Sequence, residues 1–405
     1  MTKVVVTDGE QRASLAVVRS LGRAGYHVVV CAKTARSLAG ASRWARASHL
    51  APDPLADPSG FAESARELCV RIEADLLLPI TDAALEAILP VRTHFGTTLI
   101  PFPDVEAYNR ASDKAYLVEQ AEALGIPAPR GVQLDSPDEE IRSRELPSFP
   151  LVIKPSRSVV HAGRGKAKVS VHHVPSLRDL REALARYPEA AYPLLLQERI
   201  EGTGEGGFFL MRDGLSLAEF AHRRLREKPP SGGVSVYREA VPMSEDVRSA
   251  SLALLRELDW QGVAMVEFLR SRSDGRAYLM EINGRFWGSL QLAVDAGVNF
   301  PVLLAESAMG RPVTPITEYR VGLRSRWWLG DLDHLLIRLR RRTGAVDRAP
   351  ELGSLLGAVA RFLIPWRPGD RSEVMRLSDP EPAYRELVQW IRALRNTRGE
   401  GQHDA

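Results

Sequence analysis

Two glutamates, Glu267 and Glu281, stand where paired carboxylates could hold a metal ion. Each lies inside an apolar run that predicts a β-strand, and the position halfway between them is Asp274, which forms a typical turn with Gly275. A hairpin that reverses there places the two glutamates directly opposite each other. Opposed carboxylates repel, and an unpaired ion among apolar side chains is costly, so we expect a cation between them. Two carboxylates with the amide oxygen of Asn283 form a hard-oxygen site that suits Mg²⁺, with Mn²⁺ as an alternative.

Arg285 follows on the same face of the second strand. Side chains alternate along a strand, so Glu281, Asn283 and Arg285 point one way and the intervening residues point the other way. A guanidinium two residues beyond the metal ligands is placed to meet a phosphate or a reacting acyl oxygen. The alternative is a solvent-exposed polar face with a chance pairing. An exposed polar face explains why polar side chains occur at every second position. It does not explain why the two glutamates lie inside apolar runs.

Two lysines are candidates for contact with the phosphates of a nucleotide. Lys154 ends the buried-strand run Leu151–Lys154, where a lysine either extends its ammonium to water or reaches a triphosphate. The residue alone does not decide between the two. Lys114 begins a predicted helix after Asp113, and lysines are common on helix surfaces, so the case for it is weaker.

A strand that runs into a glycine-ended connector is a candidate for contact with a nucleotide base. Leu194–Gln197 predicts the strand, and Gly202 ends the connector. Such a hinge can offer a backbone C=O and N–H to the edge of adenine between apolar neighbours, and Glu205 could hold the ribose hydroxyls. A plain strand end with exposed charges explains the same residues equally well.

Two further segments carry cations. Ser156–Lys166 holds two glycines and several basic residues, so it could close over phosphates through backbone N–H groups, although its spacing is not that of a Walker loop. The run His222–Arg226 ends a strand ahead of a loop rich in Pro and Gly, and it suits anion capture. His222 is a candidate ribose or phosphate contact, with a structural histidine as the safer alternative.

The bulk composition excludes several classes of protein. The chain has 405 residues and a net charge of +3, which gives no strong field for nucleic acid or anionic lipid. Its two cysteines form neither a metal spacing nor a disulfide framework, its nine histidines show no zinc spacing, and it has no Gly-x-Ser-x-Gly nucleophile motif. It shows no signal-peptide pattern and no apolar stretch of about 20 residues, so we expect a cytoplasmic protein without a transmembrane segment.

The elements that position these residues fall into two predicted domains. The predicted strands of residues 1–108 are Val4–Val6, Val28–Cys31, Leu76–Leu78 and Thr98–Ile100. With helices between them, they predict a Rossmann-like α/β domain. Its first turn holds one glycine where a dinucleotide fingerprint needs three, so we do not expect NAD to bind. Residues 109–310 mix strands and helices as an α+β domain does, with hairpins at Asp213-Gly214 and Asp274-Gly275.

The chain changes character after Pro312. Residues 320–348 contain eight Arg against three Asp, together with Trp327-Trp328 and an amphipathic run of leucines. We predict a helical C-terminal extension over residues 311–405. One interpretation is a solvated helix; the other is peripheral contact with anionic lipid at a membrane surface. The sequence does not indicate what the extension does.

In this order the motifs of residues 1 to about 310 resemble those of the ATP-grasp superfamily. The matching stretches are Ser112-Asp113-Lys114, Pro150–Pro155, Gln197–Ile200, His222–Arg224, Glu267 and Glu281–Arg285. The carboxylate–amine ligases of the carbamoyl-phosphate-synthase-like branch look the most similar, judging by Leu78–Asp82 and Asn283–Gly288.

The resemblance implies a Rossmann-like pre-ATP-grasp domain, an ATP-grasp fold of two α+β lobes that clamp ATP, and a lid subdomain at about residues 130–200. It implies ATP and Mg²⁺ as cofactors, a carboxylate activated as an acyl phosphate, and an amine as acceptor. The residues that it assigns are Lys114 and Lys154 to phosphates, Gln197, Glu198 and Ile200 to adenine, Glu205 to ribose, Glu267, Glu281 and Asn283 to metal, and Arg224 and Arg285 to the γ-phosphate and the acyl phosphate. The loop after Lys154 has fewer glycines than the family usually has there.

Two other functions fit the same residues. One is the activation of bicarbonate or a carbamate, as in the similar biotin carboxylases, although the chain has no Met-Lys biotin-attachment sequence. The other is a nucleotide-binding regulator without turnover. Every position of the metal site is filled, which favours an enzyme. We expect small-molecule carboxylate and amine substrates and no nucleic acid, with a homodimer as a candidate assembly.

Overall fold

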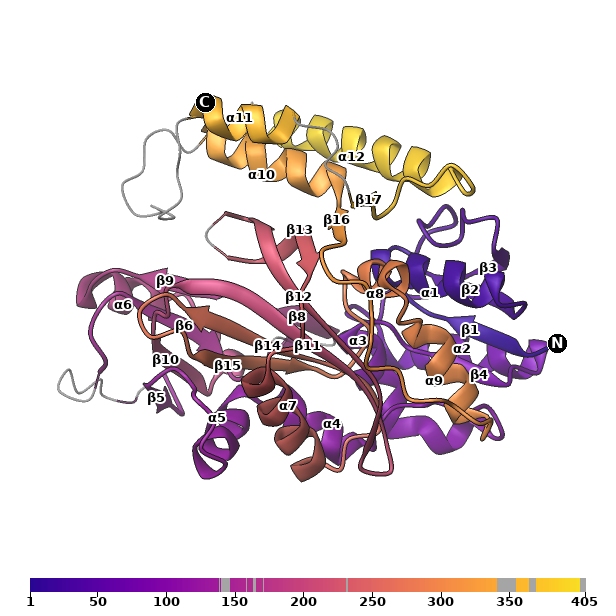
Figure 1. The fold of residues 1–405 in the computed structure, drawn as a ribbon, viewed down its shortest axis with the longest axis horizontal. Helices are drawn as coiled ribbons and strands as arrows, with labels where there is room; N and C mark the ends of the chain where they lie inside the picture. Colours follow the sequence, from indigo (N-terminus) through magenta and orange to yellow (C-terminus); the bar gives the residue numbers. More distant parts are fainter. Residues whose placement is uncertain are drawn as a thin grey trace.

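The computed structural model describes residues 1–137, 139, 146–157, 159–162, 165–169, 171–230, 232–340, 355–363 and 369–400. Within these residues three sheets, one two-stranded hairpin and the helices around them make up the fold (Figure 1). The mixed α/β and α+β character predicted from the sequence is confirmed. No helix in this part of the chain is long and apolar enough to cross a membrane.

The N-terminal sheet is parallel, with strand order β3-β2-β1-β4. Its elements are β1 (Lys3–Val6), α1 (Arg12–Arg23), β2 (His27–Ala32), β3 (Ala45–Leu50), α2 (Pro58–Ile72), β4 (Leu76–Leu78), α3 (Asp82–Ile88) and the 3-10 helix η1 (Leu89–Phe95). The valines of β1 and the leucines of β4 are fully buried. Such continuous apolar strands are expected where helices cover both faces of a parallel sheet.

Two details of this sheet differ from the sequence-based expectation. Thr98–Ile100 is not a strand, because only Leu99 forms an isolated bridge, to Leu76. The strand β3 was not predicted. Its residues are half-exposed and largely polar at the sheet edge, so they show no buried-strand pattern.

A second, smaller sheet has the order β5-β10-β6-β9. Its elements are β5 (Gly131–Leu134), β6 (Leu151–Pro155), β9 (His172–Val174), α6 (Leu177–Leu184), the 3-10 helix η2 (Glu189–Ala191) and β10 (Leu194–Glu198). Leu151, Ile153, Leu194 and Leu196 pack with Leu180 of α6 in a hydrophobic cluster separate from the main core. The hairpin of β7 (Val159–Ala162) and β8 (Gly165–Lys168) follows β6. The smaller sheet therefore has its own hydrophobic core, as a separately packed lobe requires.

Two short helices connect the first sheet to the rest of the chain. These are α4 (Val105–Ser112) and α5 (Lys114–Ala123). Asp113 caps α5 as predicted, because its carboxylate accepts hydrogen bonds from the N–H groups of Ala115 and Tyr116 at 3.0 and 3.2 Å. The predicted domain boundary at residue 108 falls inside α4.

The central sheet has the strand order β15-β14-β11-β12-β13-β16-β17. Its strands are β11 (Gly202–Arg212), β12 (Leu215–Lys228), β13 (Val234–Ala240), β14 (Gly262–Ser271), β15 (Ala277–Asn283), β16 (Arg324–Arg326) and β17 (Asp370–Ser372). Both predicted hairpins, β11–β12 and β14–β15, are confirmed.

Helices and aromatic side chains cover the two faces of the central sheet. The helix α7 (Glu245–Glu257) packs on one face, where Val247 lies beside Gly207. On the other face Phe208 stacks on Trp287, and Trp287 meets Phe300 of α9 (Phe300–Ala308) edge to face. The helix α8 (Leu290–Ala296) lies between Trp287 and α9 in the chain. The positions that alternate with Phe208 therefore face α7.

The C-terminal extension is not wholly helical. The helices α10 (Trp328–Arg340), α11 (Leu355–Leu363) and α12 (Glu381–Glu400) form a layer at the top of Figure 1. However, β16 and β17 add two strands to the edge of the central sheet and pair in parallel. The predicted extension missed both strands, since three residues are too few to show an alternation.

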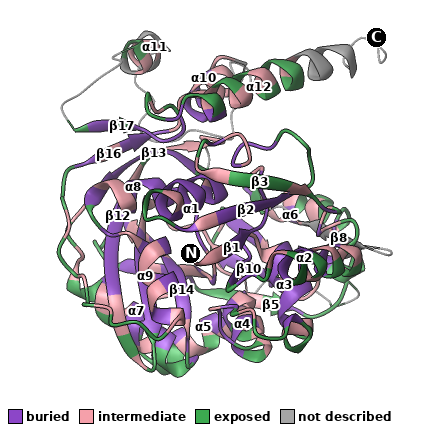
Figure 2. Cartoon of the chain, turned by 90° about the vertical axis from the view of Figure 1, so that its right-hand side faces the viewer, coloured by how far each residue is buried: buried purple, intermediate pink, exposed green. Residues whose placement is uncertain are grey.

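Buried ion pairs join the C-terminal extension to the rest of the protein. Figure 2 shows α10 and α12 of the extension above α1. Arg19 of α1 donates to Asp379 at 2.8 Å, and both side chains are almost fully buried. Glu373 accepts from Arg12 at 2.6 Å and from Arg238 of β13. Buried charges are tolerated only when paired, so these contacts hold the extension against α1 and the central sheet.

Candidate active site

Glu267 and Glu281 are direct partners in the register of β14 and β15, as predicted, although the turn itself pairs Arg270 with Ala277 and does not close symmetrically about Asp274. Both line a cleft of about 1280 Å³ between the central sheet, the smaller sheet and the N-terminal sheet. A β-bulge follows Glu267 in the pairing with β15. Asn283 ends β15 and donates its amide N–H to Glu281 Oε1 at 3.2 Å. The three predicted metal ligands therefore lie together on the wall of one cleft.

Each glutamate already has a cation beside it. Arg224 Nη2 lies 2.5 Å from Glu267 Oε2, and Lys114 Nζ lies 3.3 Å from Glu281 Oε2. Burial raises the pKa of Glu267, and this effect exceeds the attraction of Arg224. Burial acts in the same direction on Glu281, but Lys114 and the hydrogen bond from Asn283 outweigh it and lower the pKa of Glu281 to about 2. Glu281 is therefore held ionised, and each carboxylate of the pair lies within ion-pair distance of a cation.

The donor set fits Mg²⁺. Among the described residues, no three His, Cys, Asp or Glu side chains cluster as a metal site would require, so the candidate ligands are two carboxylates and one amide oxygen. Mg²⁺ usually takes one or two carboxylates and keeps its other positions for water and phosphate. Asn283 Oδ1 accepts from Arg285 Nη2 at 3.0 Å, and a carbonyl oxygen retains a second lone pair.

Asp82 is a site residue that the sequence analysis missed. It begins α3, and its Oδ2 accepts from Arg285 Nε at 2.8 Å, while Tyr108 donates to its Oδ1 at 3.2 Å. Asp82 also lines the cleft. The sequence did contain a signal for Asp82. This residue follows the carboxyl end of the buried parallel strand β4, and open α/β sheets bind their ligands at the carboxyl ends of such strands.

The two lysines both reach the cleft. Lys154 of β6 lies with Nζ 3.6 Å from Met280 Sδ, and no described carboxylate is within ion-pair distance of it. Burial lowers the pKa of Lys154, against the attraction of Glu281. An ammonium in a cleft without an acidic partner suits an anionic ligand such as phosphate.

The connector between β10 and β11 forms the other side of the cleft. Glu198 and Ile200 line it together with Val152, Leu269 and Met280, and their contact with adenine stays a prediction. These apolar side chains could sandwich a planar base. Glu198 also accepts from the backbone N–H of Arg130 at 2.9 Å. Gln197 pairs with Val152 in the sheet and is 4% exposed, and it is not among the lining residues.

The predicted ribose contact of Glu205 is wrong for this structure. Glu205 pairs in register with Phe268, so it lies on the face of β11 opposite to that of Glu267. There its carboxylate binds Arg270 at 2.8 Å, and Arg270 binds Asp246 of α7 at 2.6 Å. Alternation along β11 turns this residue away from the cleft. Glu201 of the same connector does line the cleft, and the sequence analysis did not name it as a site residue.

His222 borders the cleft but is 1% exposed. Its Nε2 forms a 2.7 Å hydrogen bond with Ser289 Oγ, and its ring stacks on Phe208. Burial, and then the charges of Arg238 and Arg224, keep the pKa of His222 well below its usual range. A neutral, packed histidine matches the structural alternative, and contact with a nucleotide stays a prediction.

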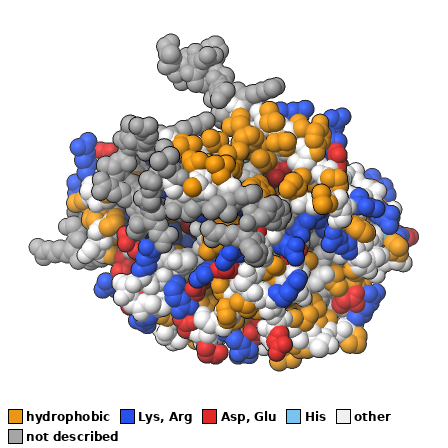
Figure 3. Space-filling view, turned by 45° about the horizontal axis from the view of Figure 1, so that its top comes forward, with side chains coloured by type: hydrophobic (Ala, Val, Ile, Leu, Met, Phe, Trp, Pro, Cys, Tyr) orange, Lys and Arg blue, Asp and Glu red, His pale blue; other side chains and the backbone are white. Residues whose placement is uncertain are grey.

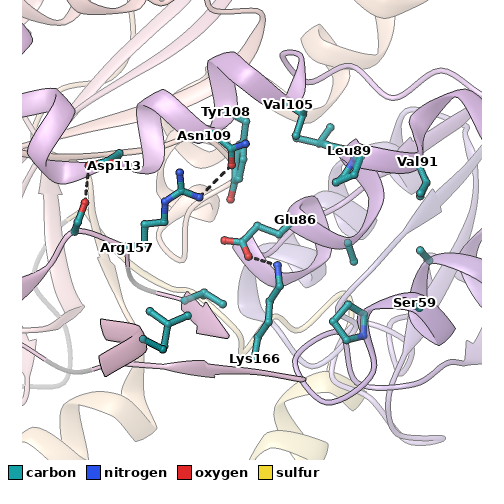
Figure 4. A pocket seen from close by; sticks show the side chains of 18 of the residues that line it. Ser59, Glu86, Leu89, Val91, Val105, Tyr108, Asn109, Asp113, Arg157 and Lys166 are labelled. Carbon is teal, nitrogen blue, oxygen red and sulfur yellow. Dashed lines mark hydrogen bonds and ion pairs between the residues drawn. The ribbon is translucent and has the colours of Figure 1, made fainter. Parts of the chain in front are cut away.

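The segment Ser156–Lys166 lies partly outside the described residues. Its last residue does not line the cleft: Lys166 donates its N–H to Leu55 O at 2.7 Å and its ammonium to Glu86 of α3. This ion pair crosses a second cavity of about 900 Å³ between α3, α4 and the β7–β8 hairpin (Figure 4). In this structure Lys166 is therefore bound to the N-terminal region instead of reaching towards the predicted phosphate positions.

Comparison with known proteins agrees with this architecture. Residues 219–329 match a family described as ATP-grasp in the biosynthetic pathway with Ter operon. The chain is 25% identical over 246 residues to the carbamoyl phosphate synthase large chain of Methanosphaerula palustris, covering 58% of this chain and 22% of that protein. It is 23% identical over 401 residues to that of Deinococcus radiodurans, covering 95% and 36%. The chain thus spans only about a quarter to a third of these relatives.

Solved structures share the fold at low identity. An ADP complex of N5-carboxyaminoimidazole ribonucleotide synthetase matches with a TM-score of 0.62 and 14% identity, over 84% of this chain and 85% of that one. An L-amino acid ligase from Bacillus licheniformis matches with a TM-score of 0.59 and 17% identity, over 76% and 74%. The chain therefore shares its fold with these solved structures and contains a segment that matches an ATP-grasp family. In sequence it is similar to the carbamoyl phosphate synthase large chains, as its motifs predicted.

Proposed function

We propose that the chain is an ATP-dependent ligase. It phosphorylates a small carboxylate and passes the acyl group to an amine, releasing ADP and phosphate. The observation that carries this proposal is the pair Glu267 and Glu281, opposed on neighbouring strands and facing a cleft with four cationic side chains around them. Metal-assisted phosphoryl transfer needs this combination of hard-oxygen ligands and fixed positive charge.

The proposed residue roles follow from position. Glu267, Glu281 and Asn283 would hold Mg²⁺, with Mn²⁺ as an alternative, and the bound ion would supply positive charge against the triphosphate. Lys114 and Lys154 would contact phosphates.

The remaining roles concern the base and the reacting groups. Glu198 and Ile200 would contact adenine, with Gln197 in the strand behind them. Arg285, held by Asp82, would meet the acyl phosphate, and Arg224 the γ-phosphate.

The reaction has two steps. A carboxylate oxygen of the substrate attacks the γ-phosphorus in line, and the bond from that phosphorus to the ADP oxygen breaks. The amine nitrogen then attacks the acyl carbon, phosphate leaves, and the nitrogen loses a proton. The protein positions the groups and excludes water from the acyl phosphate between the steps.

A second candidate is the activation of bicarbonate or a carbamate. It is favoured by the shared fold with a biotin carboxylase from Campylobacter jejuni, which has a TM-score of 0.62 at 14% identity. Bicarbonate-dependent release of ADP without any added amine would select this alternative. ATP binding without turnover over a broad substrate screen would select an inactive regulator.

The proposal includes an arrangement of parts. Residues 1–108 are the pre-ATP-grasp domain, 109–310 the ATP-grasp domain with a lid at about 130–200, and 311–405 the C-terminal extension, in a cytoplasmic protein with a homodimer as candidate assembly. Figure 3 shows hydrophobic side chains on the upper part of the molecule. In the C-terminal helix α12, Tyr384 and Leu387 are 60% and 42% exposed. Sedimentation with anionic liposomes tests the predicted membrane contact of this region.

The function is tested by trapping the acyl phosphate. The wild-type protein receives MgATP, hydroxylamine and a library of acids, and an activated acid appears as its hydroxamate. We expect at least one acid to give a hydroxamate with the wild type and none with Glu281→Ala. Release of phosphate that survives the loss of Glu281 would show that the metal site is assigned wrongly.

A further inference from the structure

The cleft reaches the carboxyl edge of the N-terminal sheet. Residues 11–13 follow β1 in the chain, residues 80–82 follow β4, and both groups line the cleft. The two strands are parallel neighbours, with Val6 opposite Leu78, whereas the next strand of the chain, β2, lies on the other side of β1. Parallel sheets covered by helices bind their ligands where the strand order reverses in this way. We therefore expect a ligand beside Arg12.

The ligand at this edge is not expected to be part of a dinucleotide. The turn after β1 contains one glycine, Gly9, where a dinucleotide fingerprint needs three. The apolar wall proposed for adenine includes Val152, Ile200 and Met280, which come from other elements of the cleft. The cleft volume of about 1280 Å³ exceeds the roughly 300–1,000 Å³ of a typical small-molecule pocket, so there is room for an acid beside a nucleotide.

The C-terminal extension holds Arg12 from two sides. Arg12 Nη1 donates to Glu373 Oε2 at 2.6 Å, and the guanidinium carbon lies 3.8 Å from the ring centre of Trp327. The side chain of Glu373 is 2% exposed and also accepts from Arg238. Trp327 donates through Nε1 to Glu386 at 2.7 Å. Since both partners of Arg12 are themselves fixed, its guanidinium has a defined position.

Most of the hydrogen-bonding capacity of Arg12 is left for a ligand. A guanidinium carries five N–H donors, and Glu373 is the one hydrogen-bond acceptor of Arg12 among the described residues. The side chain of Arg12 lines the cleft and keeps 11% of its surface exposed, whereas Glu373 does not line the cleft. A guanidinium that is fixed by its surroundings and keeps free donors is preorganised to bind a carboxylate.

Arg12 shares this edge of the sheet with the residue that holds Arg285. Asp82, which follows β4, accepts from Arg285 Nε at 2.8 Å. Because β1 and β4 are paired, Arg12 and Asp82 follow the same end of two neighbouring strands. In the proposed function Arg285 meets the acyl phosphate, which leaves the unreacted carboxylate of the substrate without an assigned cation.

We propose that Arg12 holds the carboxylate group of the substrate until it is phosphorylated, and that Glu373 of the C-terminal extension is the positioning residue of Arg12. The extension, whose Arg326 and Arg338 also line the cleft, thereby takes part in substrate binding. This inference rests on the proposed ligase function and adds a substrate-binding residue to it.

Steady-state kinetics in the hydroxylamine trap test the role of Arg12. The probe is a panel of amino acids and short mono- and dicarboxylic acids with MgATP, and the acid that gives the most hydroxamate with the wild type is used for the variants. We expect Arg12→Gln to raise the KM for this acid at least about 10-fold, with kcat and the KM for ATP within about threefold. Arg12→Lys should restore part of the loss, because it keeps the charge. An unchanged KM for the acid, or an equal rise in the KM for ATP, overturns the inference.

A double-variant cycle tests the role of Glu373. Glu373→Gln keeps the size of the side chain and removes its charge, so we expect the KM for the acid to rise at least about fivefold. Combined with Arg12→Gln, the same change should add nothing to the KM, because Glu373 acts through Arg12. Losses that simply add would show that Glu373 acts independently and would overturn its positioning role.

The matched control lies on the same helix. Arg23 of α1 donates to Ser378 of the extension at 3.0 Å and does not line the cleft, so the kinetic constants of Arg23→Ala should stay within about threefold of the wild type. Thermal unfolding of each variant shows whether a loss comes from misfolding. Arg12→Gln leaves Glu373 paired with Arg238, so it decides the role of Arg12 even where Glu373→Gln does not fold.

Failure of the inference and failure of the function give different results. Hydroxamate formation with an unchanged KM for the acid in Arg12→Gln contradicts only the role of Arg12. No hydroxamate from any acid with the wild type, with MgATP still bound, contradicts the ligase function and the inference that rests on it.

Discussion

Asp82 and Arg285 form an ion pair across 203 residues of chain, with Asp82 Oδ2 2.8 Å from Arg285 Nε. Asp82 begins α3 of the N-terminal region, and Arg285 follows the metal-site hairpin β14–β15. Arg285 also donates to Asn283 Oδ1 at 3.0 Å. The guanidinium is thus fixed between a candidate metal ligand and the first sheet, so the N-terminal region sets its position in the cleft.

Replacing Asp82 with Asn keeps the size of the side chain and removes its charge. We expect kcat to fall about 30-fold, because a hydrogen bond between charged groups contributes about 2 kcal/mol, whereas the KM for ATP should stay within about threefold. Steady-state kinetics measure both. Tyr108→Phe removes the other bond to Asp82, at 3.2 Å, and serves as control with a loss below about threefold. Equal losses in the two variants would argue against a specific role for the ion pair.

Glu281 and Glu205 provide a matched pair of acids on the two faces of one sheet. Glu281→Gln removes a proposed metal ligand that Lys114 helps to keep ionised, and we expect turnover to fall at least about 100-fold. Glu205→Gln affects only the pair with Arg270 on the α7 side, so ADP formation should change less than about threefold. A 10-fold rise in the KM for ATP in the Glu205→Gln variant would support contact between Glu205 and the ribose, which the structure contradicts.

The metal pair could be predicted because its geometry is local. The turn beside Asp274 sets Arg270 opposite Ala277, and the β-bulge after Glu267 then brings Glu267 opposite Glu281. The cap at Asp113 and the hairpin at Asp213-Gly214 have the same local origin. Each depends on residues within about fifteen positions of one another.

The remaining site residues depend on contacts that one strand does not encode. The register of β11 with β14 turns the side chain of Glu205 away from the cleft. The sequence of β11 alone does not determine this register. Asp82 meets Arg285 only after the N-terminal sheet has packed on the central one. Arg326 and Arg338 reach the cleft because β16 joins the sheet edge and α10 packs against β12. Long-range packing decides these positions.

Gly284 separates Asn283 from Arg285, and its backbone lies against Trp260. A Cβ at this position would lie 2.4 Å from Trp260 Cη2, and Trp260 is 1% exposed and bound through Nε1 to Val263 O at 3.3 Å. The ring cannot move without disturbing the core, so either the backbone of Gly284 or the core must shift.

We expect Gly284→Ala to lower the free energy of unfolding by about 1–3 kcal/mol and to lower kcat at least about 10-fold, since it displaces two site residues at once. Denaturant unfolding and kinetics measure the two effects. Gly288→Ala is the control, because its Cβ would meet only the guanidinium group of Arg12, at 3.2 Å, and no backbone or ring atom. A well-folded and fully active Gly284→Ala protein would contradict the proposed geometry.

Glu386 of α12 is expected to make the stability of the protein depend on pH. Burial raises the pKa of Glu386 to about 7, although Trp327 Nε1 donates to its carboxylate at 2.7 Å and Arg12 is nearby. The usual pKa of a glutamate is 4.5, so between about pH 4.5 and 7 the folded protein binds a proton that the unfolded chain releases. Stability is therefore lost as the pH rises through this window.

Glu386→Gln removes the ionisation and keeps an oxygen for Trp327. At pH 8 we expect the variant to be more stable than the wild type by on the order of 1 kcal/mol, since partial exposure screens the effect, and at pH 5 the difference should be near zero. Urea unfolding at pH 5, 6, 7 and 8 measures this. Glu381→Gln, in an exposed pair with Arg385 on the same helix, should show a small change that is the same at every pH. A Glu386→Gln protein that is less stable than the wild type at pH 8 would contradict this prediction. It would mean that the folded protein holds the Glu386 carboxylate ionised where it contacts Trp327.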